Sequence, residues 1–168
     1  MFAATHIEAA SKDEFYAELA QQACALLHGE RDRVANAANF AALVWHALPA
    51  INWCGFYFFD GRELVVGPFQ GKPACVRIAL GKGVCGTAAQ TRQTQLVDDV
   101  NAFAGHIACD GASRSELVVP LIDARGVLLG VWDVDSPELA RFDAADRRGM
   151  ERLCAAFVAS LEPAAAAA

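Results

Sequence analysis

The chain has 168 residues, 55% hydrophobic and 20% charged, and this balance predicts one globular domain rather than a disordered segment. The net charge of -6, with no basic stripe, argues against a nucleic-acid-binding protein. No apolar run approaches the roughly 18 residues of a membrane span. The first residues lack the basic and apolar regions of a signal peptide, so we expect a cytoplasmic protein. A single domain is expected over residues 1–168, with flexible ends at 1–10 and 163–168.

Two helices are predicted in the N-terminal part of the chain. Ser11 and Glu14 form a capping box, and apolar residues follow it at helical spacing, which predicts a helix from about Lys12 to His28. A second helix is expected from about Arg33 to Ala47, where Pro49 prevents its continuation. Cys24 in the first helix is interpreted as a small core residue.

The hydrophobic period then changes to that of strands. Residues 52–59 are aromatic and β-prone, and Asp60-Gly61 is a hairpin turn signal. Residues 63–70 are expected to return as the second strand, with Pro68 marking its end or an edge. Alternation along the first strand places Cys54 on the core side.

Trp53 and Tyr57 are expected on the opposite face of that first strand. Composition favours neither of two interpretations for this pair. The two rings either pack in the core or line a pocket.

Short elements and loops are expected in the middle of the chain. We predict a strand at 75–80, a glycine-rich turn at 81–86, a short helix at 87–90 and a strand at 95–97. The turn lacks the Gly-Lys-Ser/Thr ending of a phosphate-binding P-loop. Residues 98–115 show no long periodic element, which in a compact domain indicates a functional loop or lid.

A second hairpin and a helix complete the predicted domain. Residues 116–123 and 127–135 are apolar on both faces, so both faces of these strands should be covered. Asp143 caps the last helix, whose buried stripe includes Cys154. We therefore expect an α+β fold with a central antiparallel sheet. The N- and C-terminal helices should cover one face, and loops should cover a ligand pocket on the other.

Six cysteines are many for a chain of this kind, and none forms a Cys-x-x-Cys pair. In a reducing cytosol, cysteines lie in cores, at metals or in redox catalysis. Cys75 and Cys85 are in loop-like segments, and Cys109 is in a Gly/Ser-rich loop. A protonated His106 would favour a thiolate at Cys109, whereas Asp110 would disfavour it, and the sequence leaves the balance open.

Three acids stand at the ends of the predicted apolar strands. Asp133 and Asp135 are two residues apart, so their carboxylates should point the same way. The face that they share is expected to hold Val127, Leu129 and Val131. Unpaired acids on such a face are costly, which indicates a site for a cationic group such as the ammonium of an amino acid. The alternative is a strand that ends in solvent. Glu116 is either a surface charge or a carboxyl held near the thiol.

Six runs of the sequence resemble one known family, namely residues 52–57, 67–78, 81–88, 106–110, 113–116 and 132–137. At these positions the chain is similar to the GAF-domain free methionine-(R)-sulfoxide reductases, and the likeness extends over about residues 52–157. Generic GAF sensor domains lack the three cysteines at positions 75, 85 and 109.

The resemblance implies that free methionine-(R)-sulfoxide is reduced to methionine. Cys109 would be the nucleophile, Cys75 the main resolving thiol and Cys85 a second or auxiliary one. Trp53 and Tyr57 would shape the slot for the methyl-sulfinyl end. The residues expected to hold the substrate and polarise the sulfoxide are Glu116, Asp133 and Asp135. No cofactor or metal would be bound, thioredoxin would be the external reductant, and a homodimer is expected because similar proteins tend to be dimers.

The chemistry requires such a set of groups. Sulfoxide oxygen leaves only when it is protonated or hydrogen-bonded, so an acid is needed. A thiolate must attack the sulfur, and the resulting sulfenic acid condenses with a second thiol. Two other hypotheses remain. One is a GAF module that only binds a small ligand such as a nucleotide or tetrapyrrole. The other is a structural zinc site built from His106, Cys109, Cys75 and Cys85.

Overall fold

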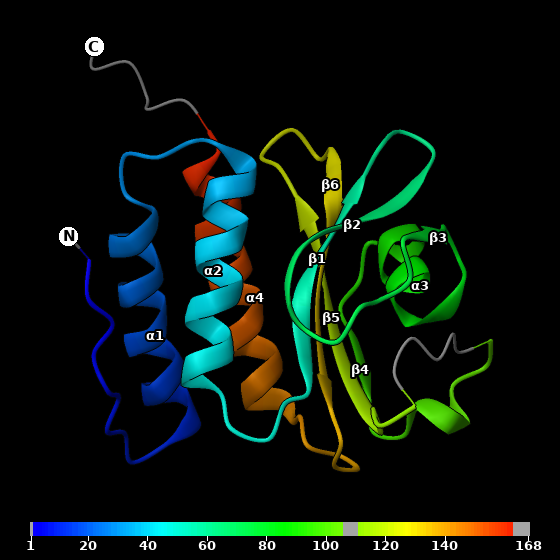
Figure 1. Cartoon of the computed structure of the whole chain (residues 1–168), viewed down its shortest axis with the longest axis horizontal. Helices are drawn as coiled ribbons and strands as arrows, with labels where there is room; N and C mark the ends of the chain where they lie inside the picture. Colours follow the sequence, from blue (N-terminus) through cyan, green and yellow to red (C-terminus); the bar gives the residue numbers. More distant parts are fainter. Residues whose placement is uncertain (1, 106–110, 163–168) are drawn as a thin grey trace.

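A six-stranded antiparallel sheet separates three long helices on one face from one short helix on the other (Figure 1). The computed structural model describes residues 2–105 and 111–162. The strand order is β3-β2-β1-β6-β5-β4. The strands are β1 (Trp53–Phe59), β2 (Glu63–Gly71), β3 (Arg77–Ala79), β4 (Gln95–Val97), β5 (Ser115–Ile122) and β6 (Leu128–Ser136). The helices are α1 (Lys12–Leu27), α2 (Arg33–Ala47), α3 (Gly83–Thr91) and α4 (Ala144–Ser160), with a short 3-10 helix at Val100–Ala102.

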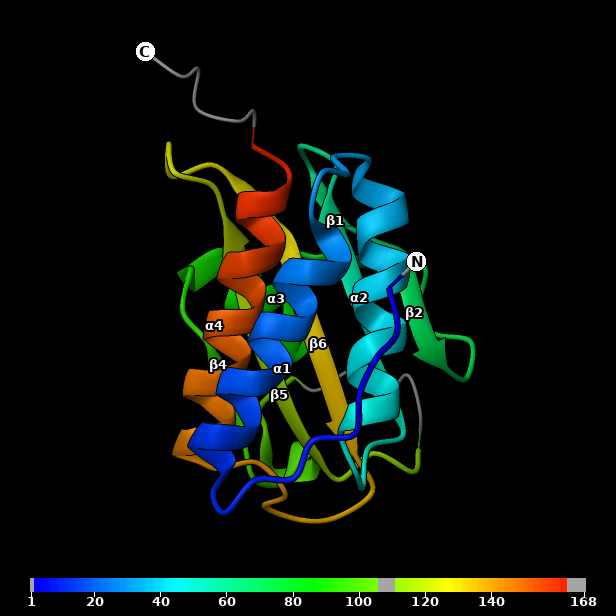
Figure 2. The ribbon, with the colours of Figure 1, turned by 90° about the vertical axis from the view of Figure 1, so that its left-hand side faces the viewer.

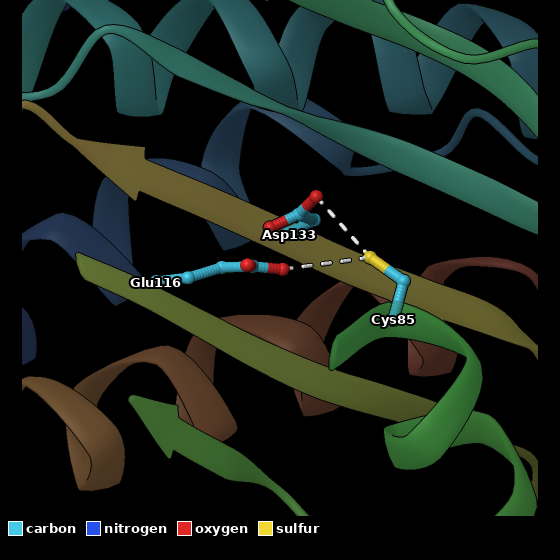
Figure 3. A group of neighbouring side chains, drawn as sticks. All are labelled: Cys85, Glu116 and Asp133. Carbon is cyan, nitrogen blue, oxygen red and sulfur yellow. Dashed lines mark hydrogen bonds between the residues drawn. The ribbon is translucent and has the colours of Figure 1, made fainter. Parts of the chain in front are cut away.

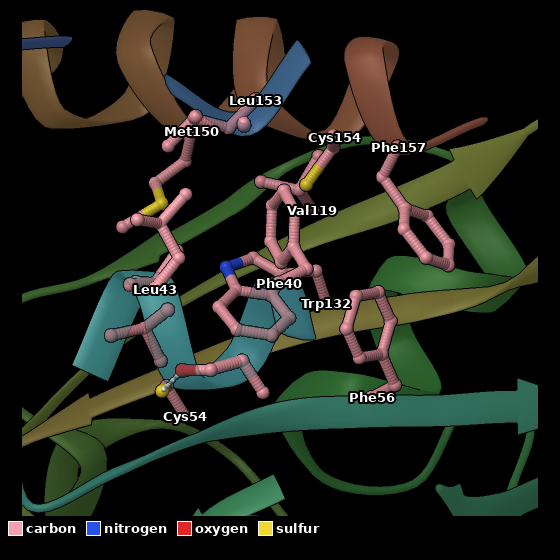
Figure 4. Close-up of a cluster of buried hydrophobic side chains, with 14 of the residues drawn as sticks. Phe40, Leu43, Cys54, Phe56, Val119, Trp132, Met150, Leu153, Cys154 and Phe157 are labelled. Carbon is pink, nitrogen blue, oxygen red and sulfur yellow. Dashed lines mark hydrogen bonds between the residues drawn. The ribbon is translucent and has the colours of Figure 1, made fainter. Parts of the chain in front are cut away.

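The larger hydrophobic core lies on the face of the sheet that α2 and α4 cover, and α1 packs on the outer side of these two helices (Figure 1, Figure 2). Aromatic side chains from α2, β1, β6 and α4 meet in this layer (Figure 4). Phe40 and Trp132 pack edge to face, with centroids 4.8 Å apart and planes at 88°, a geometry favoured by the ring quadrupoles. Cys54 and Cys154 lie buried in this layer, as predicted.

A smaller core lies on the opposite face, between the central strands and α3. It includes Trp53 and Tyr57, so the predicted alternation along β1 is confirmed. The apolar residues of β5 also divide between the two layers, which confirms that both faces of the second hairpin are covered. The expected α+β arrangement, with the terminal helices on one face, is confirmed.

Helix ends follow the capping signals in the sequence. The Ser11 side chain accepts a hydrogen bond from the Glu14 amide at the start of α1. Asp143 and Asp146 form a reciprocal capping box at the start of α4. Asp146 is also buried against α1, where it accepts a hydrogen bond of 2.9 Å from the Tyr16 hydroxyl. One capping residue therefore also joins the first and last helices.

Three local expectations need correction. The short helix α3 begins at Gly83, not at Thr87, so Cys85 lies in its first turn and not in a loop. Gly86 is required inside this helix because a Cβ there would lie 2.3 Å from the Ala79 carbonyl oxygen. Cys24 is exposed rather than part of the core.

The strands also depart from simple alternation at two irregularities. In β6, Leu121 pairs with Gly130 and Ile122 with Leu128, so Leu129 is an extra residue and turns toward the helical layer. The expectation that Leu129 shares a face with Asp133 is therefore wrong. Leu128 lies on that side instead. β2 continues through Pro68 to Gly71, with a register shift opposite Phe56.

No helix within residues 2–105 and 111–162 is both long and apolar enough to cross a membrane. The expected boundaries of the domain and its flexible ends stay predictions.

The contact between α1 and α4 depends on Gly149. A Cβ at this position would lie 2.1 Å from Cγ of the Tyr16 ring, and Tyr16 is buried. Gly149→Ala should therefore destabilise the fold by about 1–3 kcal/mol through overpacking, although alanine is the better helix former by about 1 kcal/mol. The free energy of unfolding from urea titration measures this. A more stable Gly149→Ala protein would show that the helices have room to adjust.

Candidate active site

A cavity lies on the α3 side of the sheet, between the central strands, the first turn of α3 and the segment that joins β2 to β3. It holds about 540 Å³ of space free of atoms, part of it open to solvent. The lining residues are Trp53, Tyr57, Lys72, Pro73, Ala74, Ile78, Lys82, Gly83, Val84, Cys85, Ser113, Glu116, Asp133 and Asp135.

One thiol and two carboxyls from three different elements meet in this cavity (Figure 3). Cys85 Sγ, on α3, is 3.2 Å from Asp133 Oδ2 on β6 and 3.9 Å from Glu116 Oε1 on β5. Their exposed fractions are only 4%, 6% and 5%, respectively, so the thiol and both acids are screened from bulk water. We call these three residues the Cys85–Glu116–Asp133 cluster.

Strand register brings the acids together. Glu116 on β5 pairs with Asp135 on β6, and Trp53 on β1 pairs with the same Asp135 from the other side. Asp133 lies two residues before Asp135, so both side chains are on the cavity face. The prediction that Asp133 and Asp135 share a face is confirmed, and Glu116 belongs to the same site.

Burial changes the protonation of the cluster. Burial raises the pKa of Glu116 well above its usual value, and the neighbouring charge of Asp133 raises it further. The pKa of Asp133 is raised to about 7, because the effect of burial exceeds the opposite effect of its hydrogen bonds with Cys85 and Glu116. The pKa of the Cys85 thiol is also raised, first by burial and then by the two acids. The surroundings of the cluster therefore favour the protonated form of Glu116 and the thiol form of Cys85.

Stacked aromatic rings form the apolar wall. The Trp53 ring lies 5.8 Å from Tyr57 and 5.3 Å from Phe69, at angles of 28° and 18°. The Trp53 Nε1 proton is donated to the Lys72 carbonyl oxygen at 3.1 Å, which fixes the ring. Trp53 and Tyr57 both pack in the smaller core and line the cavity, so both interpretations of this pair are correct.

Of the other two predicted thiols, the structure describes Cys75 but not Cys109. Cys75 is partly buried in the segment after Ala74, and packs against the smaller core next to the cavity lining. Cys109 and its neighbour His106 lie outside the described residues, as do Asp110 and the structural zinc site that would use Cys109.

Sequence reasoning missed two parts of the lining. Ser113 is buried at the cavity and its Oγ accepts a hydrogen bond from Asn52 Nδ2 at 3.0 Å. The first turn of α3, with Lys82 before it, lines the cavity and has no side-chain cap. The available signal was Lys82 at the position before Gly83, where a Ser, Thr, Asp or Asn would cap the helix. Helix amides without such a cap can bind an anion.

The fold and the cavity match a known class of domain. Residues 18–162 match the family model of the GAF domain. The free methionine-R-sulfoxide reductase of Escherichia coli (strain K12) is 49% identical over 145 residues, which cover 86% of this chain and 87% of that protein. The enzyme of the same name from Saccharomyces cerevisiae is 46% identical over 150 residues, covering 85% of this chain and 83% of that one.

A solved structure extends the likeness to the whole fold. The X-ray structure of free methionine-R-sulfoxide reductase from Neisseria meningitidis in complex with its substrate superposes with a TM-score of 0.90 at 42% identity, covering 96% of each chain. The chain therefore belongs to the GAF-domain family of free methionine-R-sulfoxide reductases.

The raised pKa of Asp133 predicts a pH-dependent stability. Because its pKa in the folded protein, about 7, exceeds the unfolded value near 3.8, its stabilising contribution is complete at low pH and is lost as the pH rises through 7. Asp133→Asn should therefore gain stability relative to the parent as the pH rises from about 4 to about 7. Denaturant titrations of the reduced protein measure this, with the exposed Asp98→Asn as the control. An equal pH dependence in parent and Asp133→Asn would contradict it.

Proposed function

We propose that the protein reduces free methionine-(R)-sulfoxide to methionine. The observation that carries this proposal is the cluster itself, in which a thiol and a buried carboxyl with a raised pKa lie beside a wall of stacked aromatic rings. Similar proteins from Escherichia coli and Saccharomyces cerevisiae bear the name of this activity, which supports the proposal.

The cavity suits a zwitterionic amino acid with a methyl-sulfinyl end. The flat faces of Trp53 and Tyr57 offer apolar contact to the methyl group and the side-chain carbons. Asp135 and Asp133 on the cavity face provide negative charge for the ammonium. The uncapped first turn of α3 and the neighbouring Lys82 provide backbone N–H groups and positive charge for the carboxylate. A peptide-bound residue has lost its ammonium, so it would not gain the attraction of these two acids.

Glu116 is the proposed acid. Sulfoxide oxygen is a poor leaving group until a proton is supplied, and a carboxyl whose pKa is raised by burial holds one at neutral pH. Asp133 maintains this state because its own charge, when present, disfavours ionisation of Glu116. Three acids in one cavity would titrate as a group.

Cys109 is proposed as the nucleophile. Its thiolate attacks the sulfoxide sulfur as Glu116 gives its proton to the oxygen. The sulfur–oxygen bond and the new sulfur–sulfur bond then break, methionine leaves with the electron pair, and the OH group stays on Cys109 as a sulfenic acid. A second thiol, proposed to be Cys75, then displaces water and closes a disulfide. The raised pKa of Cys85 makes it a poor thiolate, which supports the auxiliary role proposed for it.

The electron donor and setting complete the proposal. A dithiol of the thioredoxin type would reduce the disulfide by exchange and restore both thiols. No bound cofactor takes part in this cycle. We further propose a homodimer in the cytoplasm. Sedimentation of the purified protein tests its oligomeric state.

Turnover is measured by thioredoxin-coupled NADPH consumption with free methionine-(R)-sulfoxide. We expect activity in the parent and in Cys24→Ser, which removes an exposed thiol far from the chemistry, and loss of at least a thousandfold in Cys109→Ser. The (S)-isomer and N-acetylmethionine sulfoxide should be poor substrates. Undiminished turnover by Cys109→Ser would remove Cys109 from the role, and binding without turnover by the parent would favour a sensor.

Glu116→Gln should keep the shape and the burial of the side chain while losing the acidic proton. We expect kcat to fall by about 10²–10⁴-fold, the usual contribution of a positioned general acid, with a smaller change in the dissociation constant for methionine. Steady-state kinetics and calorimetric titration with methionine separate the two effects. Full turnover in Glu116→Gln would exclude this residue as the acid.

A further inference from the structure

We propose that the Cys85–Glu116–Asp133 cluster is a binding site for a borderline-soft divalent cation, Zn²⁺ above all, and that the bound ion blocks the substrate cavity. The inhibitory consequence rests on the proposed function. The binding itself does not.

The spacing of the three donor atoms suits zinc. Tetrahedral zinc binds sulfur at about 2.3 Å and carboxylate oxygen at about 2.0–2.2 Å, which puts a bound sulfur and oxygen roughly 3.5–3.7 Å apart. Cys85 Sγ lies 3.2 Å from Asp133 Oδ2 and 3.9 Å from Glu116 Oε1, on either side of that separation. All three donor atoms lie within 4.8 Å of one another, so shifts of a few tenths of an ångström would complete the geometry.

Within the described parts of the chain, the side-chain partners of Cys85, Glu116 and Asp133 include no Lys or Arg. Asp133 is only 6% exposed, and its Oδ1 has no hydrogen-bond partner within the described parts of the chain. A buried carboxylate with an unpartnered oxygen is costly, and a cation bound to the same carboxyl group through Oδ2 would offset its charge. A divalent ion would likewise stabilise two neighbouring acids that otherwise disfavour each other's charge.

The donor types select the ion. A thiolate ligand favours zinc and other borderline-soft ions over Mg²⁺ and Ca²⁺, which prefer oxygen ligands only. Three protein ligands leave a fourth position open on the cavity side, as in zinc sites that exchange a water or a small ligand. Binding displaces the thiol proton of Cys85, because the metal ligand is the thiolate.

The other buried thiols are not built in this way. Cys54 Sγ lies 3.6 Å from the Ala41 carbonyl oxygen within the helical core, and Cys154 is buried in the same layer. Within residues 2–105 and 111–162, Cys85, Glu116 and Asp133 make up the one group of three such side chains placed to share an ion.

An ion at this position would lie where the sulfoxide is proposed to bind. It would neutralise Asp133, take the proton-bearing carboxyl of Glu116 as a ligand and occupy Cys85. Substrate and zinc should therefore compete, and a chelator should restore the free site. No electron transfer is involved in this step, since the cluster only exchanges protons for the ion.

The test is calorimetric titration of the reduced, untagged full chain with Zn²⁺ in a thiol-free buffer. We expect one Zn²⁺ per chain, at least tenfold weaker binding in Cys85→Ser and in Glu116→Gln, and unchanged binding in Cys24→Ser. Binding should persist in Cys109→Ser, which separates this cluster from a site that uses Cys109. If Cys85→Ser fails to fold by circular dichroism, Glu116→Gln and Asp133→Asn serve instead.

Cobalt gives a second measurement. Co²⁺ bound to the parent should show the charge-transfer absorption of a cobalt–thiolate bond, and Cys85→Ser should lack it. Absence of zinc binding, unchanged binding in Cys85→Ser, or loss of binding in Cys109→Ser would each overturn the proposal. A protein that binds zinc but has no reductase activity would refute the proposed function and leave the metal site standing.

Discussion

The site depends on the burial of two carboxyls against one thiol on the apolar face of a sheet. Glu116 and Asp133 are each at least nine-tenths buried, and Cys85 closes the space between them and α3. Two acids in such a place cannot both ionise cheaply, so one keeps its proton. The proposed chemistry needs that proton on the sulfoxide oxygen. The same crowding of oxygen and sulfur atoms gives the cluster the spacing of a metal site.

The fold maintains this costly arrangement by fixing both acids on strands. β5 and β6 form the most extensively paired hairpin of the sheet and are covered on both faces. The helical layer supports the hairpin from behind, where Phe40, Trp132 and Phe157 pack tightly. The acids are thus held on paired strands, whereas Cys75 lies in the connection between β2 and β3. The proposed acid–base groups are on the scaffold, and the proposed resolving thiol is in a connection.

Much of the fold could be predicted from periodicity and caps. α1 and α2 lie where the apolar spacing, Ser11 and Pro49 put them, because both signals act within a few residues. The placement of Trp53 and Tyr57 on the face opposite Cys54 followed from strict alternation in β1. Such alternation failed in β6, because the bulge at Leu129 depends on a close approach of Gly130 to the Tyr57 carbonyl oxygen, which is a contact between distant residues. The glycines around Cys85 were wrongly interpreted as a turn, because Gly86 is needed for a close contact with Ala79 that the local sequence does not show.

The family resemblance identified the candidate residues and allowed the hypothesis of a raised pKa for Glu116, but the sequence alone did not show the shared burial that causes it. Nothing in the spacing of Glu116 and Asp133 shows that they share one buried space, and their raised pKa values arise from that burial. The most direct test is infrared difference spectroscopy of the reduced protein at neutral pH. We expect the carbonyl band of a protonated carboxylic acid in the parent, and a weaker band in Glu116→Gln, to which Asp133 with its pKa of about 7 still contributes. A parent spectrum with ionised carboxylates only would contradict the account.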